Sequence, residues 1–165
     1  MEFSHPFSVQ DIVIQEQPDV MVLQNSDGLA ALHRATLGTI WEDSYYQCII
    51  NQGFSFAVLK NILVGACLCQ RLDADTGEIL FIGVLPSWRR RGWAKTMLQT
   101  VMNVAKKEGI TVLYLEVEVS NIPAQALYAS MGGEQVGIRR DYYGYGRDAQ
   151  TWVLNTSYQR STPAP

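Results

Sequence analysis

The chain has 165 residues, of which 47% are hydrophobic and 18% are charged, and its net charge is −3. This composition is typical of one soluble globular domain and excludes a wholly disordered chain. No apolar run reaches the ~18 residues that a membrane span needs, and residues 1–6 lack the basic and apolar segments of a secretory signal. The three cysteines, an odd number, indicate no disulfide framework, so we expect a cytoplasmic protein with reduced thiols.

The charge is distributed unevenly along the chain. Residues 1–82 carry three Lys/Arg and ten Asp/Glu, whereas residues 83–165 carry ten Lys/Arg and six Asp/Glu. A basic half suits a phosphorylated ligand and an acidic half suits a cationic substrate, although solvated charges placed by chance give the same count. The longest Lys/Arg run is Arg89-Arg90-Arg91, so direct binding to nucleic acid is not favoured.

The first half of the chain predicts strands and helices in alternation. Residues 1–18 show no clear pattern and form an N-terminal arm of uncertain structure, ahead of a single domain at residues 19–154. Ser26 and Asp27 are typical helix caps, and they precede leucines at helical spacing. Strand and turn patterns predict the other elements. We expect a strand at 19–24, a helix after Asp27, a second helix at 41–50, and strands at 54–59, 62–71 and 78–84.

The second half contains the most clearly amphipathic segment, residues 92–107. Lys106 and Lys107 occupy its last turn, and Gly109 is a typical stop. The order of elements predicts an α/β fold with one mixed sheet of about six to seven strands, flanked by about four helices. We expect a ligand near the central β-α-β-α stretch. The remaining expected elements are strands at 112–119, 135–140 and 150–154, a helix at 122–131, and a flexible tail at 155–165.

An anion site is predicted where the strand at 78–84 leads into the helix at 92–107. A glycine-containing turn that opens a helix exposes free backbone N–H groups, and the helix dipole adds positive charge there, which suits a pyrophosphate. Gly92 and Ala94 are small enough to admit phosphates, and three arginines precede them. An ordinary turn with solvated arginines is the alternative. The chain lacks the motifs of a P-loop NTPase and of a Rossmann dinucleotide site.

The motif Arg89-x-x-Gly92-x-Ala94 resembles the acyl-CoA pyrophosphate loop of the GNAT acetyltransferase superfamily. The resemblance covers most of residues 19–154, and the downstream blocks are similar to the bacterial RimI branch. It implies the GNAT acyl-CoA N-acyltransferase fold, acetyl-CoA as the donor, and a protein N-terminus, such as that of a ribosomal protein, as the acceptor. The blocks are Leu113-Tyr114-Leu115-Glu116-Val117, Ser120-Asn121, Ala126-Leu127-Tyr128, Arg139-Arg140-Asp141-Tyr142-Tyr143 and Gly146-Arg147-Asp148-Ala149.

The resemblance also implies which residues perform the chemistry. It places the general base on Glu116, which burial in an apolar strand would strengthen, and the general acid on Tyr128, whose phenol is a donor at neutral pH. The residues alone leave open that Glu116 is exposed or paired with an arginine, and that Tyr128 is a core side chain. The chemistry needs no metal, so no metal site is expected. The expected coenzyme contacts are Ile82, Gly83, Val84, Arg89, Arg90, Arg91, Gly92, Trp93, Ala94, Lys95 and Asn121.

The acceptor is less well defined than the donor. By position, Trp41, Tyr142 and Tyr143 are candidate substrate-binding residues, with core packing of Trp41 as the alternative. The RimI branch usually has arginine where this chain has Glu118, so its peptide preference is expected to differ. A lysine side chain or a small-molecule amine is an alternative acceptor, and a catalytically silent acyl-CoA-binding or partner-binding module is an alternative function. The sequence predicts no oligomeric state.

Overall fold

Seven strands form one mixed sheet in the order β1-β2-β3-β4-β5-β7-β6. The computed structural model describes residues 20–23, 25–59 and 62–157. Within these ranges the predicted order of elements and the α/β class are confirmed, although several ends lie a few residues from their expected places. The elements are β1 (Val20–Val22), α1 (Leu29–Leu37), α2 (Asp43–Gln52), β2 (Phe56–Leu59), β3 (Leu63–Arg71), β4 (Thr76–Val84), the short 3₁₀ helix η2 (Pro86–Trp88), α3 (Trp93–Lys107), β5 (Val112–Glu118), α4 (Ile122–Ser130), β6 (Glu134–Arg139) and β7 (Ala149–Asn155).

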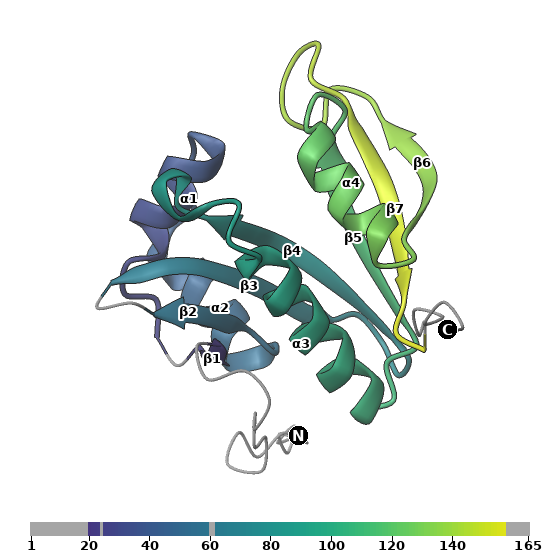
Figure 1. Cartoon of the computed structure of the whole chain (residues 1–165), viewed down its shortest axis with the longest axis horizontal. Coiled ribbons are helices and arrows are strands. Elements are labelled where there is room, and N and C mark those ends of the chain that lie inside the picture. The colour runs from purple at the N-terminus through teal and green to yellow at the C-terminus, as the bar shows by residue number, and fades with distance from the viewer. Residues whose placement is uncertain (1–19, 24, 60–61, 158–165) are drawn as a thin grey trace, which may run out of the picture.

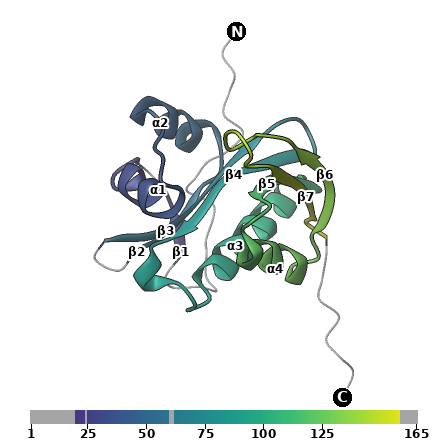
Figure 2. The ribbon, with the colours of Figure 1, turned by 90° about the horizontal axis from the view of Figure 1, so that it is seen from above.

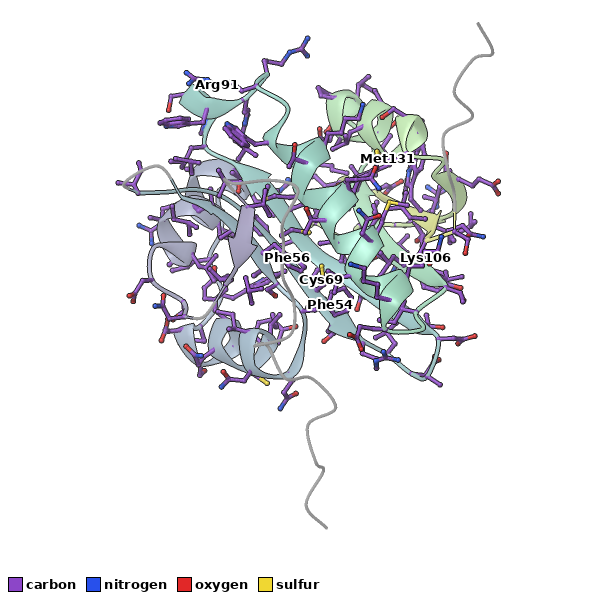
Figure 3. The ribbon with its side chains drawn as sticks, turned by 60° about the horizontal axis from the view of Figure 1, so that its bottom comes forward. Phe54, Phe56, Cys69, Arg91, Lys106 and Met131 are labelled. Atoms are coloured by element: carbon purple, nitrogen blue, oxygen red, sulfur yellow. The ribbon has the colours of Figure 1, made fainter. Side chains whose placement is uncertain are left out.

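Helices cover both faces of the sheet, with α1 and α2 on one side and α3 and α4 on the other (Figure 2). Each pair buries its own apolar core, because side chains alternate between the two faces of a strand. The core beneath α3 is the larger one and contains Phe54, Phe56 and Cys69, which Figure 3 shows under this helix. The core beneath α1 and α2 includes Leu29, Leu32, Tyr46, Ile49, Leu68 and Phe81.

The first helix begins differently from the sequence prediction. Ser26 and Asp27 do not cap α1; its N-cap is Gly28, which has a left-handed backbone with φ of 79°. The Ser26 hydroxyl instead donates a hydrogen bond of 2.7 Å to Asp43 Oδ1 at the start of α2. This hydrogen bond connects the segment before α1 to the start of α2. A capping rule that considers only neighbouring residues does not predict a contact between residues so far apart in the sequence.

The strands β4 and β5 are parallel neighbours over only part of their length. Their pairing runs from Thr76 with Val112 to Ile79 with Leu115, and beyond this point the two strands diverge (Figure 1). A β-bulge lies at the same place, because Leu80 is an extra residue of β4 opposite β3. Such a bulge bends its strand and interrupts the ladder. It also places Leu80 and the next residue, Phe81, on the same face of the sheet.

The ends of the described chain bear on the predicted domain limits. Strand β7 extends to Asn155, and the buried Thr156 donates its hydroxyl to the backbone oxygen of Ile110 at 2.8 Å. The first residues assigned to the predicted tail therefore belong to the folded domain. The predicted arm at 1–18 and residues 158–165 lie outside the described residues. No helix in the described ranges is long and apolar enough to cross a membrane.

Replacing Leu98 by alanine tests the core beneath α3. Leu98 has no exposed surface, so Leu98→Ala should lower the free energy of unfolding by about 2–5 kcal/mol, through lost burial and a cavity. The matched control is Gln99→Ala on the exposed face of the same helix, which should stay within about 0.5 kcal/mol of the parent. Urea unfolding of the three proteins measures both changes, and equal effects of the two substitutions would contradict the assigned core.

Candidate active site

Two adjoining hollows lie where β4 and β5 diverge. The large hollow has a volume of about 370 Å³ and the small hollow about 70 Å³. The large hollow runs between the α1–α2 layer and the β6–β7 loop, and the small hollow extends toward α4. Residues that line both hollows, including Ile79, Leu80, Glu116 and Tyr143, form the wall that joins them. The large hollow is lined by His33, Leu37, Thr39, Trp41, Tyr45, Glu78, Ile79, Leu80, Glu116, Tyr142, Tyr143 and Arg147.

Glu116 lies at the junction of the two hollows. It is the first residue of β5 beyond the last β4–β5 pair, so its side chain meets the opening rather than a neighbouring strand. The adjacent Leu115 and Val117 point into the core beneath α3, and the alternation of the strand turns Glu116 to the other face.

The surroundings of Glu116 are not those expected of a carboxylate buried among apolar residues. Its side chain is 11% exposed, and Oε1 accepts a hydrogen bond of 3.1 Å from Nη1 of Arg139 on β6. The carboxylate is therefore mostly buried, as expected, but it also has a charged partner. The pairing with an arginine, which the residues alone left open, is what the fold produces.

Tyr128 lines the small hollow together with Glu116. Its side chain comes from α4 and is almost fully buried, with its ring near that of Trp152. Burial raises the pKa of the Tyr128 phenol well above its ordinary value, with smaller contributions from Cys67 and Tyr143. The group is therefore protonated throughout the physiological pH range and is available as a proton donor.

The three aromatic residues predicted to bind substrate meet at the large hollow. Tyr142 and Tyr143 reach it from the β6–β7 loop, and Trp41 reaches it from the segment before α2. The Tyr143 hydroxyl donates a hydrogen bond of 3.1 Å to the backbone oxygen of Glu116, and burial raises the pKa of this phenol. Tyr143 therefore anchors the loop directly to the strand that carries Glu116.

Glu118 forms an ion pair within the protein. Both of its carboxylate oxygens accept hydrogen bonds from Arg147 of the β6–β7 loop, at 2.8 and 2.7 Å. This guanidinium lowers the pKa of Glu118. The negative charge at this position is therefore balanced by a residue of the same chain, and the pair closes the β6–β7 loop against β5.

The predicted anion site has an unusual backbone. Arg90 and Gly92 have positive φ values of 63° and 84°, and Gly92 is the N-cap of α3. The N-cap glycine has no side chain that could cap the backbone N–H groups of the first turn of this helix. The geometry suits a ligand that supplies acceptor oxygens.

Two of the three arginines in this loop make contacts within the protein, one with β4 and one with the loop itself. Arg89 Nε donates a hydrogen bond of 3.0 Å to the backbone oxygen of Val84, and the guanidinium of Arg91 lies over the ring of Trp88 at 4.7 Å. Figure 3 shows Arg91 at the outer end of the loop, away from the core. Arg90 and Lys95 are also exposed. Arg89 therefore shapes the turn through its contact with β4.

The remaining predicted coenzyme contacts lie along one path. Three of them follow the bulge on β4, in the part of the strand that no longer pairs with β5: Ile82, Gly83 and Val84. This part of β4 is suited to pair with an extended ligand as an added strand would. Asn121 lines the small hollow, but its side-chain oxygen accepts a hydrogen bond from the Ala124 backbone N–H, so it caps α4.

Several residues of the site had no predicted role. His33 and Glu78 line the large hollow, and Arg139 and Arg147 pair with the two glutamates of β5. His33 is buried against Trp41 and Phe81, with Nδ1 at 2.7 Å from the Tyr46 hydroxyl, and burial lowers its pKa. An isolated histidine gives no sequence signal for such a position. The two arginines fall within blocks of the family resemblance, but their partners depend on strand pairing.

A comparison with known families is decisive at this point. The family model described as "Acetyltransferase (GNAT) family" matches residues 26–132, more than half of the chain. The chain belongs to the GNAT acetyltransferase family. The resemblance stated from the sequence motifs is thereby confirmed, and this GNAT protein is an N-acetyltransferase by its family and its relatives.

Two curated relatives and one solved structure illustrate the similarity. The [ribosomal protein bS18]-alanine N-acetyltransferase of Escherichia coli K12 is 31% identical over 124 residues, covering 73% of this chain and 84% of that protein. N-alpha-acetyltransferase 50 of Danio rerio is 30% identical over 148 residues, covering 86% of this chain and 87% of that protein. The crystal structure of the ribosomal-protein-S18-alanine N-acetyltransferase from Escherichia coli has a TM-score of 0.72 at 27% identity. The match covers 88% of this chain and 98% of that chain.

The described residues contain no cluster of three or more His, Cys, Asp or Glu side chains that could hold a metal ion. The side chains of these types that face the large hollow come from three different elements, α1, β4 and β5; they are His33, Glu78 and Glu116. The three described cysteines, Cys48, Cys67 and Cys69, are free thiols.

The Glu118–Arg147 ion pair can be measured by a double-mutant cycle with Glu118→Gln and Arg147→Gln. The coupling free energy of unfolding should be favourable but small at pH 7, because both side chains are partly exposed to solvent. Since the folded-state pKa of Glu118 is lowered, this stabilisation should be present above the ordinary carboxyl pKa and be lost as the pH falls through the lowered value. Urea unfolding at pH 7 and at a series of lower pH values tests this; coupling that does not decrease as the pH falls would contradict it.

Proposed function

We propose that the protein transfers the acetyl group of acetyl-CoA to the N-terminal α-amine of a protein. The observation that carries this proposal is the meeting of Glu116 and Tyr128 at one hollow, beside the open part of β4. The names of the two relatives above support a protein N-terminus as the acceptor. Such an amine has a pKa of about 7.7–8.0, against about 10.4 for lysine, so it is deprotonated with less assistance.

In this proposal, acetyl-CoA binds across the loop before α3 and along β4. The backbone N–H groups at the start of α3 hold the pyrophosphate, with exposed Arg90 and Lys95 beside them. The pantetheine arm lies along Ile82, Gly83 and Val84, in the space from which β5 diverges. The thioester then lies near the small hollow, and a backbone N–H close to Val84 serves the oxyanion.

The acceptor amine enters through the large hollow and attacks the thioester carbon directly. The nitrogen lone pair forms the new C–N bond, and the carbonyl π electrons move to oxygen, giving a tetrahedral intermediate. Glu116 takes the proton from the amine, directly or through a water molecule. When the intermediate collapses, the C–S bond breaks and Tyr128 supplies a proton to the departing thiolate. The proton on Glu116 returns to solvent, and Tyr128 is reprotonated from there.

A ribosomal-protein N-terminus is the first acceptor to examine, because the relative of E. coli carries that substrate in its name. Lysine side chains and small amines remain the alternatives within the same class of enzyme. The test is coenzyme A release from acetyl-CoA with three kinds of acceptor: peptides with a free N-terminus, the same peptides blocked and carrying an internal lysine, and polyamines. Turnover is expected only with the free N-terminus. Turnover with blocked peptides or polyamines would reassign the acceptor, and none with any acceptor would favour a silent module.

Substitution of the two proposed catalytic groups should separate chemistry from binding. Glu116→Gln and Tyr128→Phe should each lower kcat about 10²–10⁴-fold, the range typical of removing a general acid or base. Their affinity for acetyl-CoA should stay close to that of the parent, because neither side chain holds the pyrophosphate. Steady-state kinetics and calorimetric titration with acetyl-CoA provide the two readouts. A loss of coenzyme affinity that parallels the loss of turnover would contradict the assigned roles.

A further inference from the structure

The contact between Arg139 and Glu116 has no place in the acetyl-transfer chemistry described above. Arg139 lies at the end of β6, two strands away from Glu116 across β7. Its side chain spans that distance on the face of the sheet opposite α3 and reaches Oε1 of Glu116 at 3.1 Å. The arginine therefore contacts the residue proposed to accept the proton of the substrate amine.

Glu116 and Arg139 differ in how far their side chains are exposed to solvent. The Glu116 side chain is 11% exposed, whereas that of Arg139 is 55% exposed. The mostly buried carboxylate has lost much of its hydration, so its charge depends on the contacts that the protein supplies. Arg139, in contrast, retains water on one side and lies over the ring of Tyr142, with 4.4 Å between the guanidinium carbon and the ring centre. The aromatic ring keeps the guanidinium in place beside Glu116.

The other charged groups around Glu116 make this contact more important. Glu78 faces the same hollow from β4; its Oε2 accepts a hydrogen bond of 2.8 Å from Gln70, and it forms no ion pair with any described residue, so it adds a second carboxylate to this hollow. The opposite charges of Glu118 and Arg147 form an ion pair and neutralise each other. The phenols of Tyr142 and Tyr143 are neutral, because burial raises their pKa values, and His33 across the hollow is neutral, because burial lowers its pKa. Tyr45 on α2 and Tyr128 on α4 complete the surroundings. Arg139 is therefore the cation that neutralises Glu116.

We propose that Arg139 is a positioning residue that holds the carboxylate of Glu116 in its ionised, proton-accepting form and aims it into the hollow. This role rests on the proposed function, because it acts through the base assigned there. Without the guanidinium, Glu116 is left partly buried beside Glu78, and it takes up a proton at a higher pH. The enzyme then loses its base at the acidic end of its working range, while its coenzyme site is unchanged.

The direct test is a titration of Glu116 in the full chain. Carbon-13 NMR of protein labelled at the glutamate carboxyl carbons follows the ionisation, and Glu116→Gln identifies the signal. The midpoint for Glu116 should rise by about one pH unit in Arg139→Gln, corresponding to about a tenfold higher proton affinity. Arg139→Lys, which keeps the charge, should largely restore the midpoint. Arg140→Gln, at the neighbouring exposed arginine, is the matched control and should leave it unchanged.

Kinetics give the second readout. The ratio of kcat for Arg139→Gln to kcat for Arg140→Gln should fall as the pH is lowered, and this ratio cancels the ionisation of the substrate amine itself. The KM for acetyl-CoA should not change. An unaltered Glu116 midpoint, or a loss of kcat that is equal at every pH, would overturn the proposal. The NMR titration needs no turnover, so a failure of the proposed acceptor would not be mistaken for a failure of this role.

Discussion

The candidate active site depends on the separation of two neighbouring strands. A parallel β4–β5 pair that continued beyond Ile79 and Leu115 would fill the space that the hollows occupy. The bulge at Leu80 coincides with the end of this pairing and bends β4. The divergence has two consequences at once. It frees the backbone of Ile82–Val84 on one side, and it exposes the Glu116 side chain on the other.

The hollow formed in this way is lined by more carboxylates than such a site could hold without compensation. Glu78 and Glu116 line the large hollow, and Glu116 and Glu118 line the small one. Two arginines, from β6 and the β6–β7 loop, pair with Glu116 and Glu118. One carboxylate is left without an ion pair among the described residues, so the hollow favours a cationic or amine-bearing acceptor. The same two ion pairs, with the Tyr143 hydrogen bond to Glu116, hold the loop that forms one wall. Charge balance and wall position are therefore set by the same contacts.

At the other end of the site, the backbone is the main determinant. The guanidinium of Arg89 contacts the end of β4 and that of Arg91 contacts the loop, and both stabilise the shape of the loop. The left-handed residues Arg90 and Gly92 turn the chain so that α3 begins without a side-chain cap. An anion bound here would meet N–H groups whose positions are already determined, which lowers the ordering cost of binding. Glycine is favoured at position 92 because φ there is 84°.

The amino-acid sequence by itself determined the order of helices and strands, the loop before α3 and the family. These depend on periodicity, turn residues and short motifs, which act over a few neighbouring residues. Only the tertiary structure decided the surroundings of each site residue. Arg139 reaches Glu116 across 23 positions, and Arg147 reaches Glu118 across 29. Strand pairing and the packing of layers bring such residues together, and a local sequence pattern predicts neither of them. For the same reason, the sequence predicted Glu116 as the base but not the arginine that neutralises it.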